Sequence, residues 1–382
     1  LVILFIPIMT VSGAYTVNSS EMVGGLGIQS EHIAFISFVT SIGMAAFSPF
    51  FYSLVSVRRQ KLMSLVGFSL LAVQSYICAN TDSLFILALN SLIMGFVRQT
   101  LLMCNLFTLI KYGFGIEATR NVSPGNEPTD ETGWDALDTE KKASQPIIYF
   151  FFMLLGQIGT WITAWFAYNY HWQMVYYAML GAILVALLIT LVCMPYNPYP
   201  TKHSPLSFSK FGNVVVFCSM CCSFVYVTVY GKTYDWYDSP SICWATVIFV
   251  VSTLLFIYLE KTRRSPYFML KVFKLRSIQG GILLFIGLMI CNSSSMLVNI
   301  FVGVGMKTDQ IQIAALGNWV LVGYFIGLVT ILILNNKGVH FKWFFALGFI
   351  LIGAASLFMY FEVQTDGMLE RMKWPVIIRA TG

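Results

Sequence analysis

The stretch Gln173–Met194 reads QMVYYAMLGAILVALLITLVCM and contains no charged residue. About 20 apolar residues in an α-helix cross the roughly 30 Å of hydrocarbon in a bilayer. Blocks of similar length and composition recur along the chain, whereas the short alternating segments of membrane barrels do not. The sequence therefore predicts an all-α polytopic protein that crosses the membrane many times.

The composition of the whole chain supports this class. Of its 382 residues, 57% are hydrophobic and 10% are charged, and the mean hydropathy is +0.74. A soluble chain of this length needs far more charge to cover its surface. The net charge of +6 does not indicate a nucleic-acid partner, because the basic residues lie in short connections between apolar blocks. The expected partner is the lipid bilayer.

Reading the apolar blocks in order predicts eleven spans and the beginning of a twelfth. They cover residues 1–17, 32–55, 62–80, 84–110, 146–168, 173–194, 211–230, 241–259, 278–301, 310–334 and 341–361, with the twelfth starting near 374. The first block has no basic region before it, so we do not expect it to be a signal peptide. Because the chain starts and stops inside apolar blocks, we expect a sequence truncated at both ends.

The Lys and Arg residues of alternate connections predict the orientation, because cytoplasmic loops carry an excess of both. One side carries seventeen of them, including the cluster Arg58, Arg59 and Lys61, and the other side carries four. The richer side is predicted to face the cytoplasm.

Two connections suggest a division into parts. The segment Pro195–Lys210 contains four prolines and is predicted to be a semi-rigid linker. The segment Lys261–Arg276 is basic with interleaved aromatic residues, and is either a short helix on anionic headgroups or an ordinary cytoplasmic loop. We predict a six-helix bundle with an incomplete first span (1–194), then the linker, two extra spans and the basic segment (195–277), then an incomplete second bundle (278–382).

Patterns of catalytic or metal chemistry are absent. The sequence has no HExxH, GxSxG, Walker or Cys/His metal pattern, and its four histidines lie at span ends or in loops. Cys218 and Cys221 have the spacing of a metal or redox pair, but no second pair or nearby histidine accompanies them. We therefore expect a protein that is not an enzyme and that uses no cofactor and no metal.

Arg98 is placed deep in a complete predicted span. A charge in hydrocarbon is costly unless it faces a cavity or a partner, so such a residue is a candidate for function. Two roles are open: Arg98 binds a substrate or coupling partner, or it pairs with helix carbonyls and stabilises the bundle. No Asp or Glu lies in the middle of any predicted span, which leaves a proton-coupling group unidentified.

Uncharged polar residues inside the spans are further candidates. They are Asn18, Asn90, Gln99, Asn105, Gln157, Asn292 and Asn318, and the preferred ones are Asn18, Asn105, Gln157 and Asn318. Each could hydrogen-bond a substrate near the midplane, or could instead hydrogen-bond a neighbouring helix.

Three local motifs support a resemblance to a known family. Asn169–Gln173 reads NYHWQ in the outer turn between spans five and six, and Lys232–Pro240 reads KTYDWYDSP after span seven. In span five, Gly156 and Gly159 flank a Gln-Ile pair, and small residues of this kind let helices pack closely. These motifs resemble the "NYHW" turn, the "DW-x-S-P" connection and the Gly-rich antiporter motif of the major facilitator superfamily, in its fourteen-span drug:proton antiporter branch of the EmrB/QacA type.

Three regions depart from the pattern of that branch. The loop between spans two and three, a candidate gating loop, keeps its basic cluster but lacks the Asp and both glycines of the usual G-x-L-x-D-R-x-G-R. In span one, Asn18 matches the usual Asn, whereas Gly13 stands where the branch has Asp. In span four, Ser91 stands at the family's Arg position. It shares a helix face with Arg98, because seven residues at 100° return to within about 20°.

The resemblance implies a two-bundle fold with two extra central spans and a secondary transporter of the cell inner membrane. It implies multidrug efflux, in which small amphipathic or drug-like molecules are exported by alternating access. Its implied partners are a small-molecule substrate, a proton or other coupling ion, a periplasmic adaptor and an outer-membrane channel. The alternative is a degenerate relative that senses or scaffolds without transporting.

Overall fold

The fold is seen in a computed structural model. It describes residues 2–15, 22, 29–47, 50, 60–113, 131–194, 208–262, 273–300, 302, 310–337, 339–362 and 370–382. These residues are mostly helical, and no strand occurs among them. Eight of the described helices are long and apolar enough to cross a membrane. The predicted all-α polytopic class is therefore confirmed.

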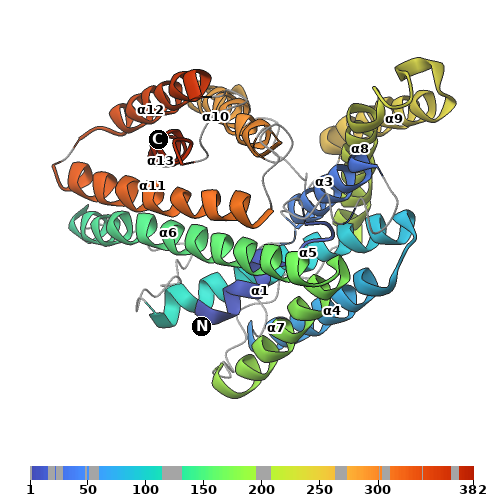
Figure 1. The fold of residues 1–382 in the computed structure, drawn as a ribbon, viewed down its shortest axis with the longest axis horizontal. Coiled ribbons are helices and arrows are strands. Elements are labelled where there is room, and N and C mark those ends of the chain that lie inside the picture. Colours follow the sequence, from blue (N-terminus) through green and yellow to red (C-terminus); the bar gives the residue numbers. More distant parts are fainter. Residues whose placement is uncertain are drawn as a thin grey trace. The chain divides into compact units, whose positions relative to one another are not determined.

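The helices follow the order of the predicted spans (Figure 1). They are α1 (Phe5–Thr10), α3 (Ser30–Ala46), α4 (Gln60–Asn80), α5 (Leu84–Gly113), α6 (Glu131–Asn169), α7 (Trp172–Cys193), α8 (Phe208–Tyr230), α9 (Pro240–Thr262), α10 (Arg276–Ile300), α11 (Gln310–Asn336), α12 (Phe341–Glu362) and α13 (Lys373–Thr381). A single-turn helix (Val2–Leu4) precedes α1, and another (Trp236–Asp238) precedes α9.

The first two helices are shorter than their predicted spans. The prediction of a span over 1–17 was wrong in its length, because α1 ends at Thr10 and Val11 is extended. The following Ser12 and Gly13 have low helix propensity, which favours an end at this point. The second predicted span ran to residue 55, whereas α3 ends at Ala46.

The helix α6 is longer than its predicted span over 146–168. It begins at Glu131 and has 39 residues. Residues 136–143 of the sequence include Ala, Leu, Glu and Lys, which are good helix formers, and they extend the helix before the apolar part. The apolar part itself, Phe150–Asn169, agrees with the prediction.

The chain divides into two compact units. Unit 1 comprises Leu1–Ala118 and Phe166–Ile278, and unit 2 comprises Thr119–Trp165 and Gln279–Gly382. Most of α6 thus belongs with the C-terminal helices, whereas the sequence division placed it in the first bundle. The division into a first bundle, a central segment and a second bundle, with boundaries at 194 and 277, stays a prediction.

Two glycines allow α3 and α5 to cross closely in unit 1. A Cβ atom on Gly95 would lie 2.0 Å from the carbonyl oxygen of Thr40, and one on Gly43 would lie 2.0 Å from that of Leu92. Helix backbones approach this closely only where a side chain is absent. The same α5 also packs on α4 and α1, so it is the helix around which this part of unit 1 is built.

In unit 2, α13 packs on α11 and α12. A Cβ atom on Gly323 would lie 2.5 Å from the Cβ of Ala380, and one on Gly327 would lie 3.2 Å from the carbonyl oxygen of Thr381. These contacts place α13 beside the middle of the apolar part of α11, Gln312–Asn335.

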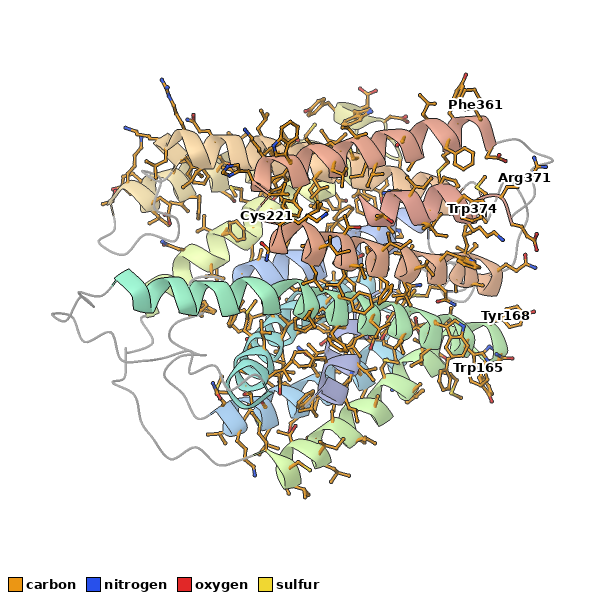
Figure 2. The ribbon with its side chains drawn as sticks, turned by 90° about the vertical axis from the view of Figure 1, so that its left-hand side faces the viewer. Trp165, Tyr168, Cys221, Phe361, Arg371 and Trp374 are labelled. Atoms are coloured by element: carbon orange, nitrogen blue, oxygen red, sulfur yellow. The ribbon has the colours of Figure 1, made fainter. Side chains whose placement is uncertain are left out.

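Aromatic residues mark one end of unit 2. Figure 2 shows Phe361 at the end of α12 near Arg371 and Trp374 at the start of α13. Phe361 is 63% exposed and Trp374 is 55% exposed. The ammonium group of Lys373 lies 5.5 Å from the ring centre of Trp319. Aromatic and basic residues of this kind are typical of the membrane interface.

Candidate functional site

Arg98 lies on α5 and contacts the end of α1. Its Nη1 donates a hydrogen bond of 3.0 Å to the carbonyl oxygen of Val11, and its Nη2 donates one of 2.6 Å to that of Met9. The last carbonyls of a helix carry partial negative charge, so they are suitable partners for a cation. The side chain lies deep in unit 1, yet part of its surface remains accessible. Its Nε is enclosed and has no hydrogen-bond partner among the described residues.

Two tyrosines lie next to this arginine in the interior of unit 1. Tyr15 is close enough to Arg98 to interact with it electrostatically. The ring of Tyr15 lies 5.1 Å from that of Tyr176 on α7, centre to centre. The Tyr176 hydroxyl donates a 2.7 Å hydrogen bond to the carbonyl oxygen of Gly13. The chain that follows α1 is thus fixed by polar contacts from both α5 and α7.

The helix α4 adds further polar groups to this interior. Asn90 of α5 donates hydrogen bonds through Nδ2 to the carbonyl oxygen of Gln74, at 2.9 Å, and to Cys78 Sγ, at 3.0 Å. The Gln74 Oε1, the Ser75 Oγ and the Tyr15 Oη are buried and have no hydrogen-bond partner among the described residues. The sequence analysis did not select Gln74, Ser75 or Tyr15. The feature of the sequence that could have identified α4 is the cluster of polar residues at positions 74, 75 and 78 in an otherwise apolar span.

Two of the predicted residues on α5 are fully buried. Ser91 donates a 2.6 Å hydrogen bond to the carbonyl oxygen of Leu87, and a Cβ atom on Gly13 would lie 1.7 Å from its Oγ. Asn105 donates a 2.9 Å hydrogen bond through Nδ2 to the carbonyl oxygen of Leu101. Both side chains are therefore bonded within their own helix, and neither is accessible to a ligand in this structure.

Two other candidates come together in unit 2. The Nε2 of Gln157 on α6 lies 2.8 Å from the place of a Cβ atom on Gly317 of α11, and the exposed Asn318 is the next residue. Gln157 and Asn318 therefore lie at the same level of the contact between α6 and α11. Gly159 is buried, whereas a Cβ atom on Gly156 would meet no described atom within 4 Å. The packing role predicted for Gly156 has no support from the described contacts.

The basic residues of the predicted gating loop are only partly described. Arg58 and Arg59 lie outside the described residues, as does Asn18. Lys61, at the start of α4, donates a 2.8 Å hydrogen bond to the carbonyl oxygen of Leu191 near the end of α7. A cation at the C-terminus of a helix is favourable, so this contact connects α4 to α7 within unit 1.

A second arginine in an apolar segment was missed by the sequence analysis. The chain contains 23 Lys and Arg, and twenty-one of them lie in connections, which leaves Arg98 and Arg379. Arg379 lies on α13, where its Nη2 donates a 3.4 Å hydrogen bond to the carbonyl oxygen of Cys291 on α10. It also interacts electrostatically with Tyr324 of α11. The signal was present in the sequence, because Arg379 follows the apolar run Trp374–Ile378.

Metal-binding clusters were also sought. Within the described ranges, no group of three His, Cys, Asp or Glu side chains could hold a metal ion. The predicted absence of metal remains an expectation. Cys218, Cys221 and Cys222 are free thiols on α8.

Comparisons with known proteins give a structural likeness only. Neither the protein-family models nor the curated proteins show a match to this sequence. The fold is similar to a crystal structure of a mutant of the nucleoside transporter NupG, with 13% sequence identity over 100% of this chain and 88% of that chain, and a TM-score of 0.40. A likeness at this level does not define a family or a cargo.

Proposed function

We propose that this chain is a secondary transporter of the major facilitator type that exports small amphipathic or drug-like molecules across a cell inner membrane by alternating access. The proposal includes two bundles with two extra central spans, as in the fourteen-span antiporter branch that the local motifs resemble. The observation that carries it is the position of Arg98 within a set of eight membrane-length helices.

Arg98 combines anchoring with residual access. A guanidinium has five N–H donors, and the hydrogen bonds to Met9 and Val11 use two of its nitrogen atoms. These contacts fix the orientation of the side chain, while part of its surface stays accessible. A fixed cation with free donors can bind an anionic group at little cost in side-chain entropy. An ionisable residue at this depth is typical of a substrate or ion pathway.

Among the residues that the structure describes, no carboxylate lies at the depth of the Arg98 charge. Among the described spans, the buried carboxylate is that of Glu260, at the end of α9, where Asn213 donates a 3.3 Å hydrogen bond to it. No Asp or Glu lies in the middle of a described span. The proposal therefore includes an anionic group, on the cargo or on a coupled ion. Proton antiport rests on the resemblance alone.

A non-transporting sensor or scaffold of the same fold is the second candidate. It is favoured by the contact between Gly13 and Ser91, which stand where the resembled branch has Asp and Arg. These two positions touch one another here without carrying charge. A relative that has lost an ion pair at this contact could keep the fold without the transport cycle.

A growth-inhibition panel separates the two candidates. The full-length gene would be expressed in a host that lacks its own efflux pumps, and the inhibitory concentration of amphipathic drugs would be measured. An exporter should raise the inhibitory concentration of at least one compound, and Arg98→Met at equal membrane abundance should remove the gain. If the wild-type protein is inserted normally and raises none of them, drug export is refuted.

A further inference from the structure

We propose that Tyr15, Gln74 and Ser75 form a hydrogen-bonding subsite in unit 1, next to Arg98, and that its ligand is a hydroxyl group of the transported molecule. This inference rests on the proposed transport function and deepens it. It assigns to the cargo an uncharged hydroxyl in addition to the anionic group proposed for Arg98.

Three side chains of this region have an enclosed oxygen atom without a hydrogen-bond partner among the described residues. The atoms are Tyr15 Oη, Gln74 Oε1 and Ser75 Oγ. The side chains are 7%, 6% and 0% exposed, so water outside the protein does not reach them. The backbone N–H of Ser12 lies near Tyr15 Oη as a donor, which leaves the hydrogen of that hydroxyl without an acceptor. Enclosed polar groups without partners are costly, so three of them in one region indicate a bound ligand or water.

The three groups meet around Cys78. On α4, Cys78 lies one turn after Gln74 and three residues after Ser75, so these side chains share one side of the helix. Tyr15 is close enough to Cys78 to interact with it electrostatically. Asn90 closes the same region, since its Nδ2 donates to Cys78 Sγ and to the Gln74 carbonyl oxygen. The helices α1, α4, α5 and α7 pack on one another around this point (Figure 1).

The subsite borders the guanidinium of Arg98. Tyr15 interacts electrostatically with Arg98 as well as with Cys78, so it connects the two. The Nε of Arg98 is likewise enclosed and without a hydrogen-bond partner among the described residues. A molecule whose anionic group is bound at Arg98 therefore has the subsite next to it.

Two further enclosed atoms on α4 and α5, Ser64 Oγ and Asn105 Oδ1, do not belong to the subsite. They lie nearer the start of α4 and the end of α5, beyond the contact of Gly67 with Leu101. A Cβ atom on Gly67 would lie 2.6 Å from Leu101 Cδ2, and Leu101 is fully buried. Apolar packing at this level separates these two atoms from Gln74.

The donors and acceptors of the subsite fit a hydroxyl group. Gln74 Oε1 only accepts hydrogen bonds, whereas the hydroxyls of Tyr15 and Ser75 both donate and accept. A ligand hydroxyl can donate to Gln74 and accept from Tyr15 or Ser75. A carboxylate has no hydrogen to donate to Gln74, so the anionic group belongs at Arg98. Water has the same donors and acceptors as a hydroxyl, so a test must separate a cargo hydroxyl from bound water.

Alkylation of Cys78 measures access and binding at the subsite without requiring transport. The full-length protein, reconstituted in phosphatidylcholine vesicles, would be treated with N-ethylmaleimide, and the modification rate of each cysteine would be followed by mass spectrometry. Cys78 should react faster than Cys104, which is equally buried but packs in an apolar cluster with Phe47 and Met63. A ligand at about ten times its Kd should lower the rate at Cys78 about tenfold, because only the unoccupied site reacts.

The probes are 3-hydroxybenzoate and 4-hydroxybenzoate, with benzoate as the control. Each hydroxybenzoate has a carboxylate for Arg98 and a hydroxyl for the subsite, and the two isomers place the hydroxyl at different separations from the carboxylate. At least one isomer should protect Cys78 with a Kd about tenfold below that of benzoate, because benzoate leaves the subsite groups unpaired. Equal protection by all three probes, or protection by none, would mean that these groups bind water only and would overturn the proposal.

A matched pair of variants on α4 identifies the site further. Ser75→Ala removes an enclosed hydroxyl without a described partner, so the Tm should not fall, whereas the Kd of the protecting hydroxybenzoate should rise about tenfold. Ser69→Ala is the control, because its exposed hydroxyl donates to the Leu65 carbonyl oxygen of the same helix, and it should leave the Kd unchanged. A fall in Tm with no change in Kd for Ser75→Ala would make the hydroxyl structural and would count against the subsite.

Access and transport give the remaining outcomes. If Cys78 reacts no faster than Cys104, the region is closed to ligands and the subsite is refuted. Protection by a hydroxybenzoate in a protein that exports nothing would support the subsite and refute the proposed function. Export of drugs by a protein in which no hydroxybenzoate protects Cys78 would refute the subsite and leave the proposed function standing.

Discussion

Arg98 in unit 1 and Arg379 in unit 2 are the two arginines that lie in apolar segments, and they are held differently. Arg98 makes two hydrogen bonds to main-chain carbonyls, at 2.6 and 3.0 Å, and its Nε is enclosed. Arg379 donates a longer hydrogen bond, of 3.4 Å, to the carbonyl oxygen of Cys291 and is less deeply buried. The difference shows that the depth of a charge in a membrane does not by itself define its role. The number and geometry of its partners decide how much of it remains free for a ligand.

The largest effect is expected at the glycines that position α5, the helix that carries Arg98. In Gly95→Leu the new side chain would meet the carbonyl oxygen of Thr40, which cannot move without displacing α3. Overpacking costs about 1–3 kcal/mol and more where backbone must shift, so we expect little folded protein. The measurement is the monodisperse yield in size-exclusion chromatography. Gly156→Leu is the control, because no described atom lies within 4 Å of its Cβ position. Equal yields for the two variants would contradict the described crossing of α3 and α5.

Replacing Arg98 tests whether its anchored guanidinium also serves transport. Arg98→Met removes the charge, and transport per inserted molecule should fall about 10- to 100-fold, as expected for a lost hydrogen bond to a charged group. Arg98→Lys keeps the charge but loses the planar fork, so part of the activity should remain. The measurement is initial transport rate divided by membrane abundance. A purely anchoring role would instead lower abundance and leave the rate per molecule unchanged.

The stability of the two arginine variants sharpens the comparison further. Arg98→Met loses two short bonds from a deeply buried guanidinium to the end of α1, whereas Arg379→Met loses a longer bond to α10 from a less buried one. A bond from a charged group contributes about 1.5–3 kcal/mol and is stronger when it is short, so we expect the larger fall in Tm for Arg98→Met. Thermal unfolding in detergent, followed by tryptophan fluorescence, provides the values. A larger fall for Arg379→Met would reverse our interpretation of which arginine is anchored.

The Tyr176 hydroxyl tests how firmly the chain after α1 is held. Tyr176→Phe removes the donor to the Gly13 carbonyl and should destabilise unit 1 by about 1 kcal/mol. Tyr177→Phe is the matched control, because its hydroxyl donates to Asn80 at an exposed position. Both Tm values would be measured under one condition. If the Tm falls no further in Tyr176→Phe than in Tyr177→Phe, the buried hydrogen bond does not contribute to stability.

The smallest effect is expected for Lys61, which lies at the start of α4 and donates to a carbonyl near the end of α7. Lys61→Met removes the bond to the Leu191 carbonyl, and a cation at a helix C-terminus contributes about 0.3–1 kcal/mol. We expect a slight fall in Tm that shrinks further in high salt, since exposed charges are screened. If Lys61→Met abolishes transport without a change in Tm, the gating role predicted from the sequence would be supported instead.

Much of the fold could be predicted from the sequence because the bilayer imposes a length on apolar helices. The blocks at 84–110 and 173–194 correspond to α5 and α7 with small differences at their ends. The end of α1 at Thr10 was not predicted, because hydropathy does not register a local change to extended backbone. The contact of Gly43 and Gly95 was not predicted either, since any glycine in a span gives the same signal.

The candidate site was only half determined by the sequence. Arg98 was selected because a charge in an apolar block is visible in composition alone, and its role stays a prediction. Its partners are main-chain carbonyls, which carry no sequence signal, and only the tertiary contact of α5 with α1 identifies them. Ser91 was a candidate from its helix face, yet the approach of Gly13 leaves it fully buried.

The sequence by itself determined that this protein is a polytopic helical membrane protein with an arginine, Arg98, deep in one of its apolar segments. The physical reason is that burial of apolar surface in lipid depends on composition and length, which are local properties. The tertiary structure decided which atoms surround each arginine, and therefore what each can bind. Hydrogen bonds depend on distances of a few tenths of an ångström between groups remote in the chain, and only the packed helices fix those distances.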